Sequence, residues 1–133
     1  MTEQSTAEIV SVFLELAREN KVDEAIERCL AASFVWDNPL PDIIPFGGRF
    51  EGHEAAARYM QLLAEAIDIE EFVVEDMICD GDRLAMTGRE TSLVRNTQRR
   101  YTMQWAHFLT AKDGKLVYWR EYNDTAEMLR AFS

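Results

Sequence analysis

One carboxylate stands out near the end of the chain, in the segment Trp119-Arg120-Glu121-Tyr122-Asn123. This aromatic segment follows an Asp113-Gly114 pair, and Asp-Gly between two apolar runs is typical of a β-hairpin turn. Alternate side chains of a strand share a face, so we expect Glu121 on the same face as Trp119 and Asn123. An ionised carboxylate facing an apolar hollow can take a proton from water or from an activated C–H. Glu121 is therefore the candidate general base.

Two further residues are candidates for assisting this base. Arg89 lies among small and apolar residues on one face of a predicted strand, where a guanidinium needs a counter-ion. A bidentate pair with Arg89 would orient Glu121 and keep it ionised. Asn38, at the end of an earlier predicted strand, could hold a water molecule or polarise a carbonyl. Buried Arg–Glu pairs also occur as structural links without a catalytic role, so both interpretations stay open.

Six more side chains are candidates for lining a ligand pocket. They come from the third predicted helix, from the strand faces that carry the three candidates above, and from the predicted strand at residues 100–110. A histidine on such a face is more often a hydrogen-bonded core residue than an acid or base, and the tryptophans suit a cavity wall and core. The six residues are Trp36, Tyr59, Thr91, Trp105, His107 and Trp119.

Composition argues against several classes of partner. A chain of 133 residues with 47% apolar residues fits one globular domain, residues 1–133. Its net charge of −10 disfavours nucleic acid and anionic membranes, which would repel it.

Two cysteines and two histidines have no zinc-site spacing, and we expect no metal or other cofactor. The sequence shows no basic–apolar leader and no run that could span a bilayer, so we expect a cytoplasmic protein with free thiols.

Hydrophobic periodicity predicts the elements that position these residues. Helices are expected at about residues 6–19, from 22 to about 32, at 53–66 and after 124, and strands at 33–38, 70–79, 83–94, 100–110 and 115–123. Residues 39–52 read as a loop rich in proline and glycine, whose apolar side chains should cover a hydrophobic cavity. The order ααβαββββα predicts an α+β fold, in which a sheet that curves around helices leaves a hollow between them.

This order and the C-terminal pattern WxHxxTxxDGKLxxWREYxDTA resemble the nuclear transport factor 2-like superfamily. The superfamily includes ketosteroid isomerases, limonene epoxide hydrolases and SnoaL-type polyketide cyclases. The resemblance implies a cone-shaped, cystatin-like roll, in which a strongly curved mixed sheet wraps around helices and encloses a deep apolar pocket. It also implies a small apolar ligand and a homodimer.

Residue by residue, the resemblance is partial. Where ketosteroid isomerases have a general-base Asp before a Pro, this chain has Asn38 before Pro39. In limonene epoxide hydrolases a Trp-Arg-Asp-Tyr segment carries the base, which corresponds to Glu121. Their Arg and Asp, two residues apart on an earlier strand, correspond to Arg89 and Thr91, so the second carboxylate is missing.

The sequence thus predicts a cofactor-free isomerase, cyclase or hydrolase acting on a small apolar metabolite, with Glu121 as the base and Arg89 as its orienter. The alternative is a non-catalytic module of the same fold that binds a small ligand or forms a dimer.

Overall fold

One six-stranded sheet dominates the computed structural model, which describes residues 4–133. The strands lie in the order β2-β1-β6-β5-β4-β3. β1 pairs with β6 in parallel, and every other neighbouring pair is antiparallel, so the sheet is mixed. The strands are β1 (Leu30–Asn38), β2 (Gly48–Glu51), β3 (Ile67–Asp80), β4 (Arg83–Val94), β5 (Arg100–Lys112) and β6 (Lys115–Asn123).

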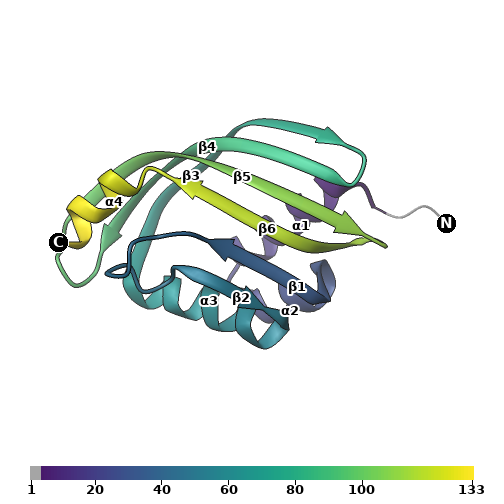
Figure 1. The fold of residues 1–133 in the computed structure, drawn as a ribbon, viewed down its shortest axis with the longest axis horizontal. Coiled ribbons are helices and arrows are strands. Elements are labelled where there is room, and N and C mark those ends of the chain that lie inside the picture. Colours follow the sequence, from purple (N-terminus) through teal and green to yellow (C-terminus); the bar gives the residue numbers. More distant parts are fainter. Residues whose placement is uncertain (1–3) are drawn as a thin grey trace.

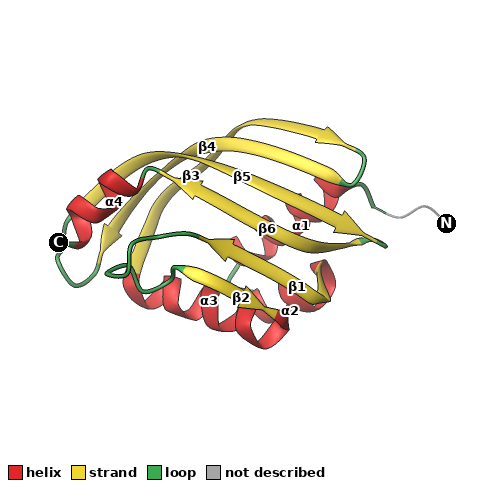
Figure 2. Cartoon of the chain, viewed as in Figure 1, coloured by secondary structure: helices red, strands yellow, loops and turns green. Residues whose placement is uncertain are grey.

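Four helices accompany the sheet: α1 (Thr6–Arg18), α2 (Val22–Cys29), α3 (Gly52–Ala66) and α4 (Thr125–Phe132). The sheet arches over α1, α2 and α3, while α4 lies at one end, against β5 (Figures 1 and 2). This is the curved mixed sheet around helices that the sequence predicted. None of the helices described is both long and apolar enough to cross a membrane.

Local sequence signals set the ends of the first and last helices. At α1, the Ser5 hydroxyl accepts from the amide of Glu8, and the Glu8 carboxylate accepts from the amide of Ser5, a complete capping box. At α4, the Asp124 side chain accepts from the amide of Glu127. The buried side of α1, which includes Phe13, faces the interior of the arch.

The structure differs from the predicted elements between residues 30 and 51. The second helix ends at Cys29, and β1 begins at Leu30, because these residues pair with β6. The predicted loop contains the short strand β2, which pairs with β1 in the register Trp36↔Phe50. Gly48 at the start of β2 and Gly47 just before it hid this strand from sequence reasoning, since glycine is typical of loops. Phe46 of the same segment is buried against Tyr59, as the apolar loop predicted.

Candidate functional site

A cavity of about 620 Å³ lies between the sheet and helices α1 and α3. Its wall is mainly apolar, and its exposed charged residues include Arg18 and Glu70. Four buried titratable side chains also line it: Tyr59, Glu90, His107 and Glu121. Apolar members of the wall include Phe13, Leu14, Met60, Leu63 and Phe72. The cavity therefore combines an apolar wall with a few buried polar groups, as small-molecule sites do.

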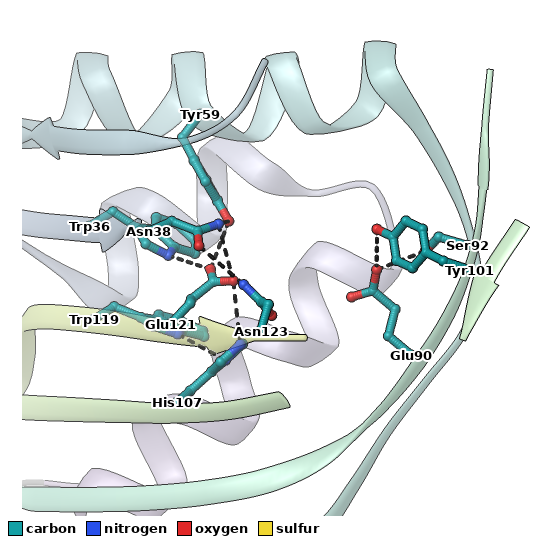
Figure 3. A network of polar contacts seen from close by, with 10 residues as sticks. All are labelled: Trp36, Asn38, Tyr59, Glu90, Ser92, Tyr101, His107, Trp119, Glu121 and Asn123. Atoms are coloured by element: carbon teal, nitrogen blue, oxygen red, sulfur yellow. Dashed lines mark hydrogen bonds and ion pairs between the residues drawn. The ribbon is translucent and has the colours of Figure 1, made fainter. Parts of the chain in front are cut away.

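Three side chains donate hydrogen bonds to the carboxylate of Glu121, which is only 8% exposed, and His107 contacts it as a fourth neighbour (Figure 3). The Trp36 indole and the Tyr59 hydroxyl each donate to Oε2 at 2.7 Å. Asn38 Nδ2 and His107 Nε2 each lie 3.4 Å from Oε1. The two oxygens differ, because 2.7 Å is a well-formed hydrogen-bond distance for both donors of Oε2, whereas 3.4 Å lies beyond the usual range.

The sheet registers explain why these side chains meet. β1 runs parallel to β6 with Trp36 beside Trp119, so two residues further along Asn38 comes near Glu121. His107 pairs directly with Glu121 across the antiparallel β5–β6 ladder. Tyr59 reaches the same carboxylate from α3.

A hydrogen bond from Trp119 determines which form of His107 faces Glu121. The Trp119 indole N–H donates to His107 Nδ1 at 3.1 Å. An indole nitrogen can only donate, so Nδ1 must accept and the ring hydrogen lies on Nε2. His107 therefore presents an Nε2–H group to Glu121.

The pKa of Glu121 is lowered by its surroundings. Burial raises the pKa, but the interaction with His107 and the hydrogen bonds from His107, Tyr59 and Trp36 outweigh that effect. Glu121 is therefore ionised at neutral pH. Within residues 4–133, no lysine or arginine forms an ion pair with it, so polar donors hold this buried charge.

Arg89 does not orient Glu121, which corrects the sequence-based prediction. Its guanidinium pairs with Glu71 and lies 3.6 Å from Glu75 on the outside of the molecule. The buried face of β4 is the other one, which carries Leu84, Met86, Gly88, Glu90, Ser92 and Val94. Arg89 is thus part of a surface ion-pair group.

Three other candidates lie away from the cavity wall. Thr91 is on the same outer face as Arg89, with its hydroxyl 2.9 Å from that of Thr102. Trp105 is buried and stacked on Phe72 at 4.8 Å, and it does not line the cavity. Asn38 is 1% exposed and supports Glu121 from behind the wall. Trp36, Tyr59, His107 and Trp119 do line the cavity.

Glu90 is a buried acidic residue of the cavity wall that sequence reasoning missed. It is 8% exposed, and its Oε2 accepts hydrogen bonds from the hydroxyls of Ser92 at 2.8 Å and Tyr101 at 2.9 Å. Burial raises the pKa of Glu90 more than these two bonds lower it, and the charge of Glu121 raises it further. The sequence contained a clue to this site, because Glu90 is the one acidic residue on the more apolar of the two faces of β4.

The SnoaL-like domain family model matches residues 10–119 of the chain. The chain belongs to this family. No curated protein matches it significantly.

Solved structures with the same fold agree with this assignment. An NTF2-like protein from Burkholderia xenovorans LB400 is 26% identical over 100% of this chain and 99% of its own, with a TM-score of 0.89. A protein from Mesorhizobium loti, described as a SnoaL-like polyketide cyclase, is 25% identical over 90% of this chain and 99% of its own, with a TM-score of 0.71. A protein from Catenulispora acidiphila with a ketosteroid isomerase-like fold, in complex with trimethylamine, is 12% identical over 93% and 91%, with a TM-score of 0.76.

Proposed function

We propose that this SnoaL-like protein is a cofactor-free acid–base enzyme that acts on a small, largely apolar molecule, with Glu121 as the proton acceptor. The observation that carries the proposal is the geometry around Glu121: an ionised, buried carboxylate on the wall of an apolar cavity of about 620 Å³. Burial of a charge is costly, and active sites are where proteins commonly maintain it.

The two carboxylate oxygens have different roles in this proposal. Oε2 is engaged by short bonds from Trp36 and Tyr59, which fix the orientation of the group. Oε1 has only long contacts, with Asn38 and His107, and is the better proton acceptor. It takes a proton from an activated C–H of the ligand, or from water that attacks the ligand, and later returns it.

Asn38, Trp36, Tyr59 and His107 act as positioning residues. Asn38 is tied on its far side by Asn123, whose Nδ2 donates to Asn38 Oδ1 at 3.1 Å. Burial, followed by the charge of Glu121, raises the pKa of Tyr59 well above its ordinary value, so its hydroxyl stays a donor. The carboxylate thus has a preorganised environment before any ligand arrives.

The family supports a small-molecule substrate and leaves isomerisation, cyclisation and hydrolysis as the candidate reactions. All three can begin with a proton taken by a carboxylate. The cyclase description of the Mesorhizobium loti protein and the trimethylamine complex of the Catenulispora acidiphila protein support a small-molecule ligand for this chain.

A non-catalytic binding module is the second candidate, and one observation favours it. Each oxygen of Glu121 already has two donors, which come from β1, α3 and β5. A carboxylate in such a place also ties these elements together structurally.

Turnover separates these two candidates. Compounds that raise the melting temperature are identified in a panel of terpene-, sterol- and polyketide-like molecules, and each is then incubated with the protein and analysed by mass spectrometry. With a compound that the wild type converts, Glu121→Gln should lower kcat by about 100-fold or more, the usual contribution of a general base. The matched control is Glu24→Gln, an exposed carboxylate on α2. Full activity of Glu121→Gln would refute the catalytic proposal.

The predicted homodimer stays a prediction, and the outer sheet face is where we propose that it forms. Phe108 and Tyr122 of neighbouring strands pack edge to face there and are 47% and 45% exposed, and Ile78 is 67% exposed. Phe108→Glu should lower the mass measured by sedimentation equilibrium from that of a dimer to that of a monomer. A wild-type protein that sediments as a monomer contradicts the prediction.

A further inference from the structure

One carboxyl group of the cavity wall has no basic partner. Four of the five acidic residues that line the cavity have an arginine or histidine nitrogen at 3.4 Å or less, in the pairs Asp68 with Arg95, Glu70 with Arg100, Glu71 with Arg89 and Glu121 with His107. The fifth is Glu90, and no lysine, arginine or histidine of residues 4–133 forms an ion pair with it. Any cation that balances a charge on Glu90 therefore has to come from a ligand.

Glu90 also has an oxygen that accepts no hydrogen bond from the part of the chain that the structure describes. Its Oε2 accepts from the hydroxyls of Ser92 and Tyr101, whereas none of the described residues donates to Oε1. Glu90 is more than nine-tenths buried and lines the cavity. Figure 3 shows Oε1 on the side of the group that faces the cluster around Glu121. This oxygen is a buried acceptor that a ligand in the cavity can reach.

The rest of the cavity wall favours a positive charge over a negative one. Its other basic groups are already engaged, and Arg18, which is exposed, lies 3.8 Å from Glu15. Aromatic rings attract cations, and five of them line the cavity: Phe13, Trp36, Tyr59, Phe72 and Trp119. The net charge of −10 also draws cations from solution toward the chain and repels anions.

We propose that the cavity binds a protonated amine with an apolar body, whose ammonium group donates a hydrogen bond to Oε1 of Glu90. In the complex Glu90 is ionised, and the ammonium group is the cationic partner that the chain does not supply. The apolar body lies against Leu14, Met60 and Leu63, which line the same cavity. The inference rests on the proposed function for the site of the ligand, and it concerns binding and not turnover.

The free protein is consistent with this assignment. Burial, and then the charge of Glu121, raise the pKa of Glu90 when no ligand is present. A bound ammonium group acts in the opposite direction, because an adjacent cation favours the ionised form of a carboxyl group. The amine and the charge on Glu90 therefore stabilise each other inside the cavity.

This arrangement selects ligands by the charge of their polar group. An ammonium group both donates to Oε1 and balances the charge of Glu90. A hydroxyl group in the same place donates a hydrogen bond but leaves that charge unbalanced, and a carboxylate adds a further negative charge. We therefore expect affinity to decrease in the order amine, alcohol, carboxylate.

Three probes built on one bicyclic skeleton test this order by isothermal titration calorimetry: 2-aminotetralin, which is protonated at neutral pH, 2-tetralol and tetralin-2-carboxylate. A skeleton of this size suits a cavity of about 620 Å³. We expect the wild type to bind the amine about tenfold more tightly than the alcohol and to reject the carboxylate. An alcohol that binds as tightly as the amine, or an amine that does not bind, overturns the inference.

Glu90→Gln tests whether Glu90 holds the ammonium group. The substitution removes the charge with little change in shape, so affinity for the amine should fall about 10- to 100-fold, the range of a hydrogen bond to a charged group. Affinity for the alcohol should change by less than about threefold. The matched control is Glu24→Gln, which changes the net charge equally on the exposed surface of α2 and should alter neither affinity. Equal loss of amine binding in the two variants would assign the effect to overall charge and contradict a site at Glu90.

Glu121→Gln separates the two buried acids of the cavity. The preference for the amine should survive in this variant, because the ammonium group contacts Glu90. Loss of the preference in Glu121→Gln and its retention in Glu90→Gln would place the ammonium group at Glu121, and the assignment would be wrong. If Glu90→Gln does not fold, the wild-type order and Glu121→Gln decide.

Failure of this inference is distinguishable from failure of the proposed function. If a neutral compound is converted in a reaction that depends on Glu121 while the amine binds no better than the alcohol, the function stands and the inference is wrong. If the amine binds through Glu90 and no compound of the panel is converted, the inference stands without the proposed catalysis.

Discussion

The indole N–H of Trp119 donates to Nδ1 of His107 at 3.1 Å, and this bond directs the opposite nitrogen of the ring toward Glu121. The bond from Trp119 holds His107 with Nε2 toward the carboxylate. His107 therefore positions the base Glu121 and is not itself the base. The arginine that sequence analysis assigned to this task lies on the other side of the sheet.

Removing the Trp119 indole donor should allow His107 to adopt either tautomer. In the wild type we expect nitrogen-15 NMR to show His107 as the Nε2–H tautomer at neutral pH. Trp119→Phe leaves Nδ1 without its donor, so the two tautomers should become mixed. The signals of His53, which lies elsewhere at Leu30 O, serve as the internal control. A wild-type His107 with its hydrogen on Nδ1 contradicts the assignment.

Glu121→Gln should destabilise the fold at neutral pH by about 1–3 kcal/mol, because buried donors lose a carboxylate acceptor. The folded pKa of Glu121 lies below its ordinary value of 4.5, so its contribution is fully present above that pH. It is lost as the pH falls through the folded pKa. Urea unfolding at a series of pH values should therefore show the wild type's advantage shrinking below pH 4.5, and a gap that is constant with pH would oppose this.

Glu90→Gln should have the opposite pH dependence. The pKa of Glu90 is raised above 4.5 in the folded protein, so the folded state binds the proton more tightly than the unfolded state does. Ionisation of Glu90 therefore costs stability as the pH rises above 4.5. Relative to the wild type, the variant should gain stability in the same urea series as the pH increases. If the stability of Glu90→Gln relative to the wild type instead increased toward acid pH, the result would contradict a raised pKa of Glu90.

Arg89→Ala should change little. Its ion pairs with Glu71 and Glu75 are about half exposed, and such pairs contribute roughly 0–1 kcal/mol. We expect a small change in the free energy of unfolding and unaltered binding of any cavity ligand, measured by calorimetry. If Arg89→Ala lost ligand binding without losing stability, Arg89 would have a role in the binding site after all.

Gly88→Ala should be among the more damaging single-methyl changes in β4. A Cβ at Gly88 would come within 1.9 Å of Val73 O and 2.5 Å of Trp105 Cζ2, so backbone and a buried indole would have to move. Overpacking of this kind costs about 1–3 kcal/mol. The neighbouring exposed Thr87→Ala should stay within about 0.5 kcal/mol in the same thermal unfolding experiment. Equal effects of the two substitutions would count against this packing.

The hairpin that carries Glu121 could be predicted because its signals are local. The Asp113-Gly114 turn and the alternation of Trp119, Glu121 and Asn123 depend on neighbouring residues only, and β6 has the predicted bounds. The capping box at Ser5 is equally local. The common face of Trp36 and Asn38 on β1 followed from the same two-residue period.

Tertiary structure decided which face of β4 is inside. Alternation divides its residues into the set with Arg89 and the set with Glu90, but either set can face the helices until the sheet is paired and curved. The β4–β5 register and the packing of the sheet over α1 and α3 settle this choice, and a shift of one position exchanges an exposed arginine for a buried carboxyl group. Sequence alone thus determined that Glu121 shares a face of β6 with Trp119 and Asn123, and only the folded chain determined that this face lies inside and which donors and second acid Glu121 meets there.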